Sequence, residues 1–281
     1  MRVANLAGRL ALIEENGAVD VNRASSGLFG AGPQAIYEQW DAFSKWAVTV
    51  DRAGLGEPFD PADLGSPSPY PRQVFAVGLN YAAHASESGF RRPDEHPPVF
   101  TKFPSCITGP FGTVRLPRGG HTDWEVELVA VIGVRAEHIR SQDAWSHVAG
   151  LAVGQDLSER ILQMASPSPQ FSLGKSYPRF GPIGPWLVSV DGFADPDDLE
   201  LGCWVNGEEV QKGRTSELIF SIPLLIETLS AVTPLLPGDV IFSGTPSGVG
   251  MGRHPQRFLS PGDELVSYVE DVGEMRHWFV A

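Results

Sequence analysis

Residues 123–133 read Asp-Trp-Glu-Val-Glu-Leu-Val-Ala-Val-Ile-Gly, and this stretch decides how the chain folds. It begins with polar and apolar residues in alternation and then becomes wholly apolar, which predicts a strand that runs from an open edge into a buried core. Side chains two residues apart share one face of a strand, so Glu125 and Glu127 project together, with Cα atoms about 6.5–7 Å apart. Two like charges side by side are unfavourable unless a cation lies between them.

A second apolar segment supplies a third carboxylate. Residues 150–156 read GLAVGQD, so this predicted strand ends at Asp156. Three carboxylates with no nearby Cys or His favour a hard cation over zinc, with Mg²⁺ as the first choice and Mn²⁺ or Ca²⁺ as the others. The alternative that spacing alone leaves open is an acidic edge that faces solvent.

A histidine and a glutamate follow another predicted strand. Residues 77–89 read VGLNYAAHASESG, in which the strand ends at Gly78 and a short Ala-rich helix follows. His84 and Glu87 then lie at i and i+3, close enough for the carboxylate to orient the imidazole and raise its basicity. A general base that activates water needs this arrangement. An ordinary exposed contact between the two side chains is the alternative.

Two further features could bind negative charge. Lys175 lies in a segment with few other cations, and its ammonium group could offset charge that develops beside a metal ion. A lysine on a surface loop is the alternative. Residues 239–245 read DVIFSGT, a buried strand that runs into a turn. Backbone N–H groups at Gly244 and the hydroxyl of Thr245 could hold a substrate carboxylate there.

Composition excludes several classes of protein. The 281 residues include 21 Lys and Arg against 34 Asp and Glu, a net charge of −13 that disfavours nucleic acid and membrane surfaces as partners. The hydrophobic share of 42% is enough for a buried core, while we expect neither a secretory signal nor a membrane span. Cys106 and Cys203 are expected to be buried free thiols. We therefore expect a soluble, cytoplasmic protein.

The glycine-rich segments do not match the sequence patterns of a P-loop, a dinucleotide-binding loop or the nucleophile elbow of serine hydrolases.

A proline-rich stretch divides the chain. Before it, strands over about 9–13 and 18–21 flank the hairpin turn at Asn16-Gly17, and an apolar face predicts a helix over about 33–50. Five prolines in 54–71 predict a boundary, with a small N-terminal α/β domain and linker over 1–71 and the main domain over 72–281. The main domain is expected to be α+β and mainly β, with one helix near 221–232 and strands at 74–77, 126–134, 151–153, 186–190, 201–205, 240–242 and 265–269.

In combination and order, these features resemble the fumarylacetoacetate hydrolase superfamily. The resemblance runs from about Val74 to the end, and its most specific stretches are VGLNYAAH, TKFPSCITGP, DWEVELVAVIG, GKSYPRFGPIGPWLV, VNGEEVQ and PGDVIFSGTPSGVG. It implies a mixed β-sandwich roll for the catalytic domain, which is usually dimeric, with a small variable N-terminal domain. Animal fumarylacetoacetases carry a further Asp ligand ahead of the catalytic His, and Val74 to Tyr81 contains none. The chain therefore resembles the short, acylpyruvase-like, mostly prokaryotic branch.

The resemblance also assigns roles to individual residues. It implies that the metal ligands are Glu125, Glu127 and Asp156, and that the catalytic residues are His84, Glu87 and Lys175. It places the substrate-binding residues at Tyr81, Arg160, Gln163, Gly244 and Thr245.

The implied activity is hydrolysis of a C–C bond in a 1,3-dicarbonyl or 2-oxo acid, such as an acylpyruvate or fumarylpyruvate. His84, oriented by Glu87, would activate the water. Decarboxylation of oxaloacetate is an alternative, as is isomerisation or hydration of 2-hydroxydienoate diacids, because all share enolate chemistry. A non-catalytic binding protein is disfavoured, since every site residue is present. We expect a homodimer that acts on a small 2-oxo acid, with the N-terminal domain shaping either the substrate mouth or the dimer.

Overall fold

The main sheet has eleven strands and runs through the whole molecule. The computed structural model describes residues 1–52 and 54–281. Neighbouring strands follow the order β3-β2-β1-β13-β11-β10-β16-β5-β6, with β4 beside β1 and β7 beside β13. Their bounds are β1 (Arg2–Leu6), β2 (Arg9–Glu14), β3 (Gly17–Asp20), β4 (Leu64–Gly65), β5 (Val74–Val77), β6 (Val99–Thr101), β7 (Ile107–Thr108), β10 (Val126–Ile132), β11 (Val148–Gln155), β13 (Gly181–Val188) and β16 (Val240–Phe242).

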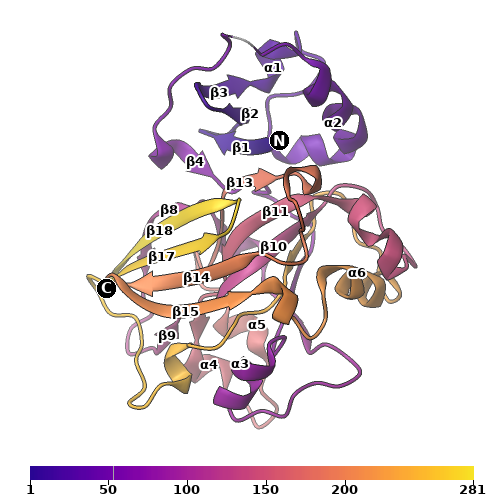
Figure 1. Cartoon of the computed structure of the whole chain (residues 1–281). Coiled ribbons are helices and arrows are strands. Elements are labelled where there is room, and N and C mark those ends of the chain that lie inside the picture. The colour runs from indigo at the N-terminus through magenta and orange to yellow at the C-terminus, as the bar shows by residue number, and fades with distance from the viewer. Residues whose placement is uncertain (53) are drawn as a thin grey trace.

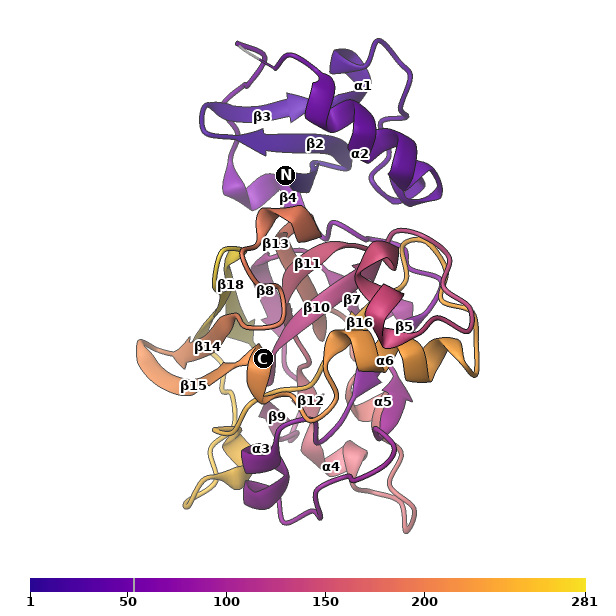
Figure 2. The same cartoon turned by 45° about the vertical axis from the view of Figure 1, so that its right-hand side comes forward.

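A second sheet of five strands packs against the main sheet (Figure 1), and a separate pair of short strands is labelled in Figure 2. Its strands, in spatial order, are β15 (Glu208–Arg214), β14 (Glu200–Val205), β17 (Glu264–Val269), β18 (Gly273–Val280) and β8 (Phe111–Arg115), and the separate pair is β9 (Thr122–Asp123) with β12 (Ser158–Glu159). Both sheets contain parallel and antiparallel neighbours. The prediction of a mainly β, mixed sandwich roll is therefore confirmed.

Apart from Glu127, strand β10 is apolar, because both of its faces are covered. Leu128 and Ala130 point into the core shared with the five-stranded sheet. Val129 and Val131 point into a second core, which includes Leu12 of the N-terminal unit. All seven residues of the strand are buried. The even-numbered residues therefore hold the two sheets together, while Val129 and Val131 join the sheet to the N-terminal unit.

Helices are short and lie at the margins of the sheets. Their bounds are α1 (Val21–Ala24), α2 (Trp40–Thr49), α3 (Ala82–Glu87), α4 (Arg160–Gln163), α5 (Phe171–Gly174) and α6 (Ile222–Ser230), with 3₁₀ turns at Gln34–Gln39, Pro61–Asp63, Pro104–Cys106, Ser141–His147, Val190–Gly192, Thr215–Glu217 and Gly250–Gly252. The predicted hairpins at Asn16-Gly17 and Asn206-Gly207 are both present. In the described chain, no helix is long and apolar enough to cross a bilayer. The two cysteines are free and buried, as predicted.

The N-terminal unit is attached to the main body by a strand that the sequence analysis missed. Strand β1 pairs with β13, with Arg2 opposite Val188 and Val3 opposite Leu187. Helices α3, α4 and α5 lie at the end of the molecule away from this unit (Figures 1 and 2). Among described residues, the cavity that these helices surround is lined only by Val77 and later positions. The N-terminal unit therefore does not line this cavity within the same chain, and its expected part in shaping the substrate mouth or the dimer stays a prediction.

Substitution of Gly154 on β11 tests how tightly the core beside this sheet is packed. A Cβ atom there would lie 2.3 Å from Val129 Cγ2 and 2.9 Å from Phe242 Cε1, and both side chains are buried. We expect Gly154→Ala to lower the free energy of unfolding by about 1–3 kcal/mol, because the core is overpacked. Gly30→Ala is the matched control, since nothing lies within 4 Å of its added Cβ. Urea denaturation measures both, and a Gly154→Ala variant as stable as the control would contradict the packing.

Candidate active site

Three carboxylates meet where strands β10 and β11 adjoin. The strands are antiparallel, so the start of β10 lies beside the end of β11, and the N–H of Asp156 donates to the carbonyl of Glu125 at 2.9 Å. One oxygen from each of Glu125, Glu127 and Asp156 lies within 4.8 Å of the others. None of the three is more than 5% exposed. The alternative of a solvent-facing acidic edge is therefore wrong, and the three oxygens share one buried space.

Three cations contact this acidic triad, and two of them, Lys175 and Arg160, pair with Glu125. Lys175 Nζ lies 2.6 Å from Glu125 Oε2 and 2.6 Å from Asp156 Oδ2, and the lysine is 2% exposed rather than on a surface loop. Arg160 Nη1 lies 2.8 Å from Glu125 Oε1. Burial raises the pKa of Glu125, but the charges of Lys175 and Arg160 outweigh it and hold that pKa below its ordinary value. Glu125 is therefore ionised.

Glu127 is the member of the triad that forms no ion pair with another described residue, and its side chain accepts a hydrogen bond from the N–H of Gly244 at 2.8 Å. Burial raises its pKa well above the ordinary value, and repulsion from Asp156 and Glu125 raises it further. The surrounding network contains four buried carboxylates, Asp123 with the triad, and three buried cations, Lys102, Arg160 and Lys175. One negative charge is left over when Glu127 ionises. An all-oxygen donor set with surplus negative charge fits a divalent ion such as Mg²⁺ or Mn²⁺.

Lys102 belongs to this network, although the sequence analysis gave it no role. Its side chain is fully buried, and Nζ lies 2.6 Å from Asp156 Oδ1. The same ammonium donates to the carbonyl oxygen of Lys175. Lys102 thus fixes one oxygen of Asp156 and the backbone that carries Lys175. The only signal in the sequence was its position inside the stretch TKFPSCITGP.

The predicted base and its partner lie together on α3. His84 Nδ1 and Glu87 Oε1 are 2.9 Å apart, and His84 is only 6% exposed, so the alternative of an ordinary exposed contact is wrong. The carboxylate of Glu87 also accepts from the N–H of Gly248, at 3.0 Å and 2.9 Å for its two oxygens. A carboxylate beside Nδ1 favours the tautomer with the proton on Nδ1. Nε2 is then the nitrogen available to take a proton.

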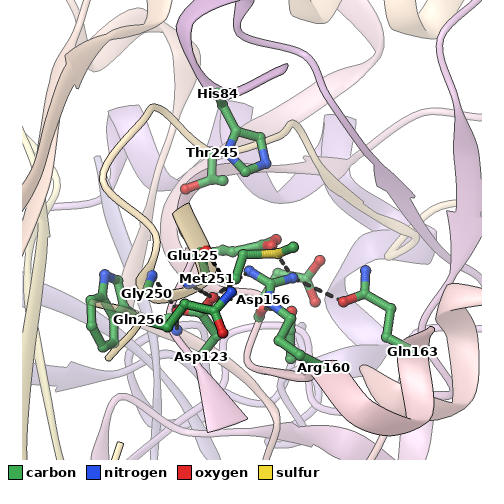
Figure 3. A network of polar contacts seen from close by, with 12 residues as sticks. His84, Asp123, Glu125, Asp156, Arg160, Gln163, Thr245, Gly250, Met251 and Gln256 are labelled. Carbon is green, nitrogen blue, oxygen red and sulfur yellow. Dashed lines mark hydrogen bonds and ion pairs between the residues drawn. The ribbon is translucent and has the colours of Figure 1, made fainter. Parts of the chain in front are cut away.

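Part of this network opens onto one small cavity of about 30 Å³. Its polar lining among the described residues consists of His84, Ser88, Glu125, Arg160, Gln163, Lys175 and Thr245, while Glu127 and Asp156 do not line it. Figure 3 shows Thr245 beside His84, with Arg160 and Gln163 across the site. The structure thus brings together most of the predicted residues. Of the remainder, Gly244 uses its N–H on Glu127, and Tyr81 is buried with no hydrogen-bond partner for its hydroxyl among the described residues.

Comparison with known proteins agrees with this geometry. Residues 73–280 match the family described as fumarylacetoacetate (FAA) hydrolase C-terminal. The chain belongs to this family. The human protein named oxaloacetate tautomerase FAHD2A, mitochondrial, is 44% identical over 209 residues, which are 74% of this chain and 66% of the human one. This chain therefore spans less than two thirds of the length of that relative.

Two solved structures from the same family extend the comparison to the whole chain. A Mycobacterium smegmatis protein, provisionally identified as HpcE, is 57% identical with a TM-score of 0.94, covering 100% of this chain and 99% of that one. Maleylpyruvate hydrolase from Sphingobium sp. SYK-6, solved with manganese(II) and pyruvate, is 28% identical with a TM-score of 0.82, covering 100% and 99%. Members of this family thus include tautomerases and hydrolases. The human relative is named as mitochondrial, so a cytoplasmic location for this chain stays a prediction.

Proposed function

We propose that this chain is a divalent-metal-dependent enzyme that transfers protons on small 2-oxo acids, and that keto–enol tautomerisation of an oxaloacetate-like acid is its first candidate reaction. The observation that carries the proposal is the position of His84 on the cavity that Glu125 and Lys175 also line. The 44% identity to a protein named oxaloacetate tautomerase supports the choice of reaction. Tautomerisation needs only a positioned base and charge stabilisation, and the site offers both.

Each residue of the site has a separate role in the proposed tautomerisation. Glu125, Glu127 and Asp156 would hold a divalent ion, which supplies the Lewis acidity that polarises the 2-oxo group. His84 Nε2 takes the proton from C3 of the keto acid, and the enolate oxygen gains a proton to give the enol. In the reverse direction the enol loses its O–H proton and His84 returns a proton to C3. Glu87 holds the imidazole through Nδ1. The ammonium of Lys175 offsets the negative charge that develops on the enolate oxygen.

A second candidate is hydrolysis of the C–C bond in an acylpyruvate or fumarylpyruvate-like acid. The structural likeness to maleylpyruvate hydrolase supports it, as does the Glu87-oriented base. His84 would take a proton from water while the oxygen of that water adds to the distal carbonyl. The C–C bond then breaks, one fragment leaves as a carboxylate, and the other is protonated at carbon to give a 2-oxo acid. The two reactions differ only in whether His84 acts on carbon or on water.

The products distinguish the candidates. The purified chain is incubated in D₂O with Mn²⁺ or Mg²⁺, or with chelator, and with either oxaloacetate or acetylpyruvate, and the mixture is followed by ¹H NMR. Tautomerisation gives metal-dependent exchange of the C3 protons without new carbon fragments. Hydrolysis of acetylpyruvate gives acetate and pyruvate, and decarboxylation of oxaloacetate gives pyruvate and carbon dioxide. Rates equal to those without enzyme on both substrates would refute the proposal.

We also propose that the chain is a homodimer, as expected from the family resemblance, with a small 2-oxo acid as its substrate. Size-exclusion chromatography with light scattering tests the assembly, and a monomer mass would refute it. Nucleic acid and membrane surfaces stay disfavoured on charge, since the net charge is −13.

A further inference from the structure

Asp123 collects more hydrogen bonds than the other carboxylates of the network, although the mechanism assigns it no part. It is fully buried at the end of β9, two residues before the ligand Glu125. Oδ1 accepts from the N–H of Trp124 at 2.8 Å and of Gly250 at 2.7 Å. Oδ2 accepts from the N–H of Met251 at 2.9 Å and from Arg160 Nε at 2.9 Å. One carboxylate thus ties together a strand, a turn and a guanidinium group.

The guanidinium of Arg160 is shared between two carboxylates. Its Nε and Nη2 atoms face Asp123, with Nη2 at 2.8 Å from Oδ2. Its Nη1 atom faces the other way, 2.8 Å from Glu125 Oε1 and 3.0 Å from Gln163 Oε1 (Figure 3). A guanidinium group can pair with both oxygens of a carboxylate at once. With its other edge held by Asp123, Arg160 contacts Glu125 through one nitrogen and one oxygen only.

We infer that Asp123 is a positioning residue that restrains Arg160, so that the guanidinium does not compete with a divalent ion for the second oxygen of Glu125. That oxygen, Oε2, faces the Asp156 side of the triad, where Lys175 Nζ contacts both carboxylates at 2.6 Å. Without the negative charge of Asp123, the strongest anion within reach of the guanidinium is Glu125. A bidentate pair between Arg160 and Glu125 would then compete with the ion for both oxygens.

The same carboxylate fixes the turn over the cavity. A Cβ on Gly250 would lie 2.7 Å from Asp123 Oδ1, so the backbone of the turn passes directly against the carboxylate. Met251, next in the chain, lines the cavity together with Arg160. Gln256 closes the turn by donating to the carbonyl of Met251 at 3.0 Å. The position of Arg160 and the wall formed by Met251 are thus set by one side chain.

The test is a double-mutant cycle read by Mn²⁺ affinity, measured by calorimetry in the full chain, and it rests on the metal site of the proposed function. Asp123→Asn keeps the shape but removes the charge. We expect it to weaken Mn²⁺ binding by roughly 10- to 100-fold, the usual effect of losing a residue that orients a metal ligand. In the Arg160→Met background, the same Asp123→Asn change is expected to leave Mn²⁺ affinity unaltered, because no guanidinium remains that could pair with both oxygens of Glu125.

Glu159→Gln is the matched control for a purely structural role. Glu159 is also buried, sits on the neighbouring strand β12 and caps α4, where it accepts from the N–H groups of Ile161 and Leu162 at 3.1 Å and 2.8 Å. Its carboxylate bonds to backbone N–H groups and forms no hydrogen bond or ion pair with the guanidinium of Arg160. This control is expected to lower the melting temperature as much as Asp123→Asn does, but to bind Mn²⁺ like the wild type.

Three results would overturn the inference. Asp123→Asn could bind Mn²⁺ as tightly as the wild type, its effect could persist undiminished in the Arg160→Met background, or Glu159→Gln could weaken Mn²⁺ binding equally. The second result would mean that Asp123 acts as a general negative charge rather than through Arg160. Failure of the wild-type chain to bind Mn²⁺ would instead overturn the proposed metal-dependent function.

Discussion

Replacing His84 with alanine is expected to lower kcat on the preferred 2-oxo acid by about 10²- to 10⁴-fold, the range that a positioned general base contributes. His84 is the only histidine among the residues that line the cavity in the described chain. Its Nδ1 is paired with Glu87, so Nε2 is left to exchange protons with substrate or water. The affinity for Mn²⁺, measured by calorimetry, should be unchanged, because the three proposed ligands are carboxylates.

His96→Ala is the control for this variant, because His96 is exposed on the segment that follows α3. It should keep full turnover and full Mn²⁺ affinity. A His84→Ala enzyme that retains wild-type turnover would mean that another group moves the proton. Loss of Mn²⁺ binding in His84→Ala would mean that the imidazole contributes to the metal site, which the all-carboxylate assignment does not allow.

The sequence predicted those parts of the fold whose signal is local. Strand β10 carries its own pattern, and the hairpins carry Asn-Gly turns, so both were found. Strand β1 was missed, although it forms a local hairpin with β2. Its pairing with β13, which lies more than 170 residues away, leaves no local signal in the sequence. Strand β18 was missed for another reason. Its buried positions alternate through Met275, His277 and Phe279, and a fully buried histidine interrupts the apolar pattern.

The site shows the same division between local and distant signals. Glu125 and Glu127 were expected on one strand, and Glu125 lies directly before β10, which carries Glu127. His84 and Glu87 share helix α3, so spacing alone suggested both pairs. Lys102 was not predicted, because a buried lysine is rare and its partner Asp156 is 54 residues away. Asp123 was quoted as the first residue of a strand, and only the folded chain brings the turn at Gly250 and the helix of Arg160 onto its carboxylate.

Replacing Glu127 with glutamine is expected to have the second large effect, on metal binding. One of three proposed ligand carboxylates is lost, so Mn²⁺ affinity should fall by more than the roughly 10- to 100-fold that outer-sphere partners cost. Activity should fall with it at any fixed Mn²⁺ concentration. The change keeps the size of the side chain and an acceptor oxygen for the N–H of Gly244. Calorimetry with Mn²⁺ measures the affinity.

In the metal-free protein at high pH, the same substitution is expected to stabilise the fold against unfolding. Burial and the neighbouring carboxylates raise the pKa of Glu127 in the folded state. The native state therefore keeps its proton at pH values where the unfolded chain, with an ordinary pKa near 4.5, has lost it. Unfolding then releases a proton, so stability falls as pH rises above about 4.5 until the raised pKa is passed, by about 1.4 kcal/mol for each unit of elevation. Glu127→Gln has no such proton to lose.

Thermal unfolding with chelator, from about pH 5 to about pH 9, measures this difference. The wild type should lose stability with rising pH relative to Glu127→Gln, and saturating Mn²⁺ should remove the wild-type loss while leaving the variant unaffected. Glu95→Gln, at an exposed position, is the control and should follow the wild type in both conditions. Parallel pH profiles for wild type and Glu127→Gln would mean that the pKa of Glu127 is not raised in the folded state, because the positive charge of a neighbouring side chain offsets its negative charge. In that event, surplus negative charge could not be what draws a divalent ion into the triad.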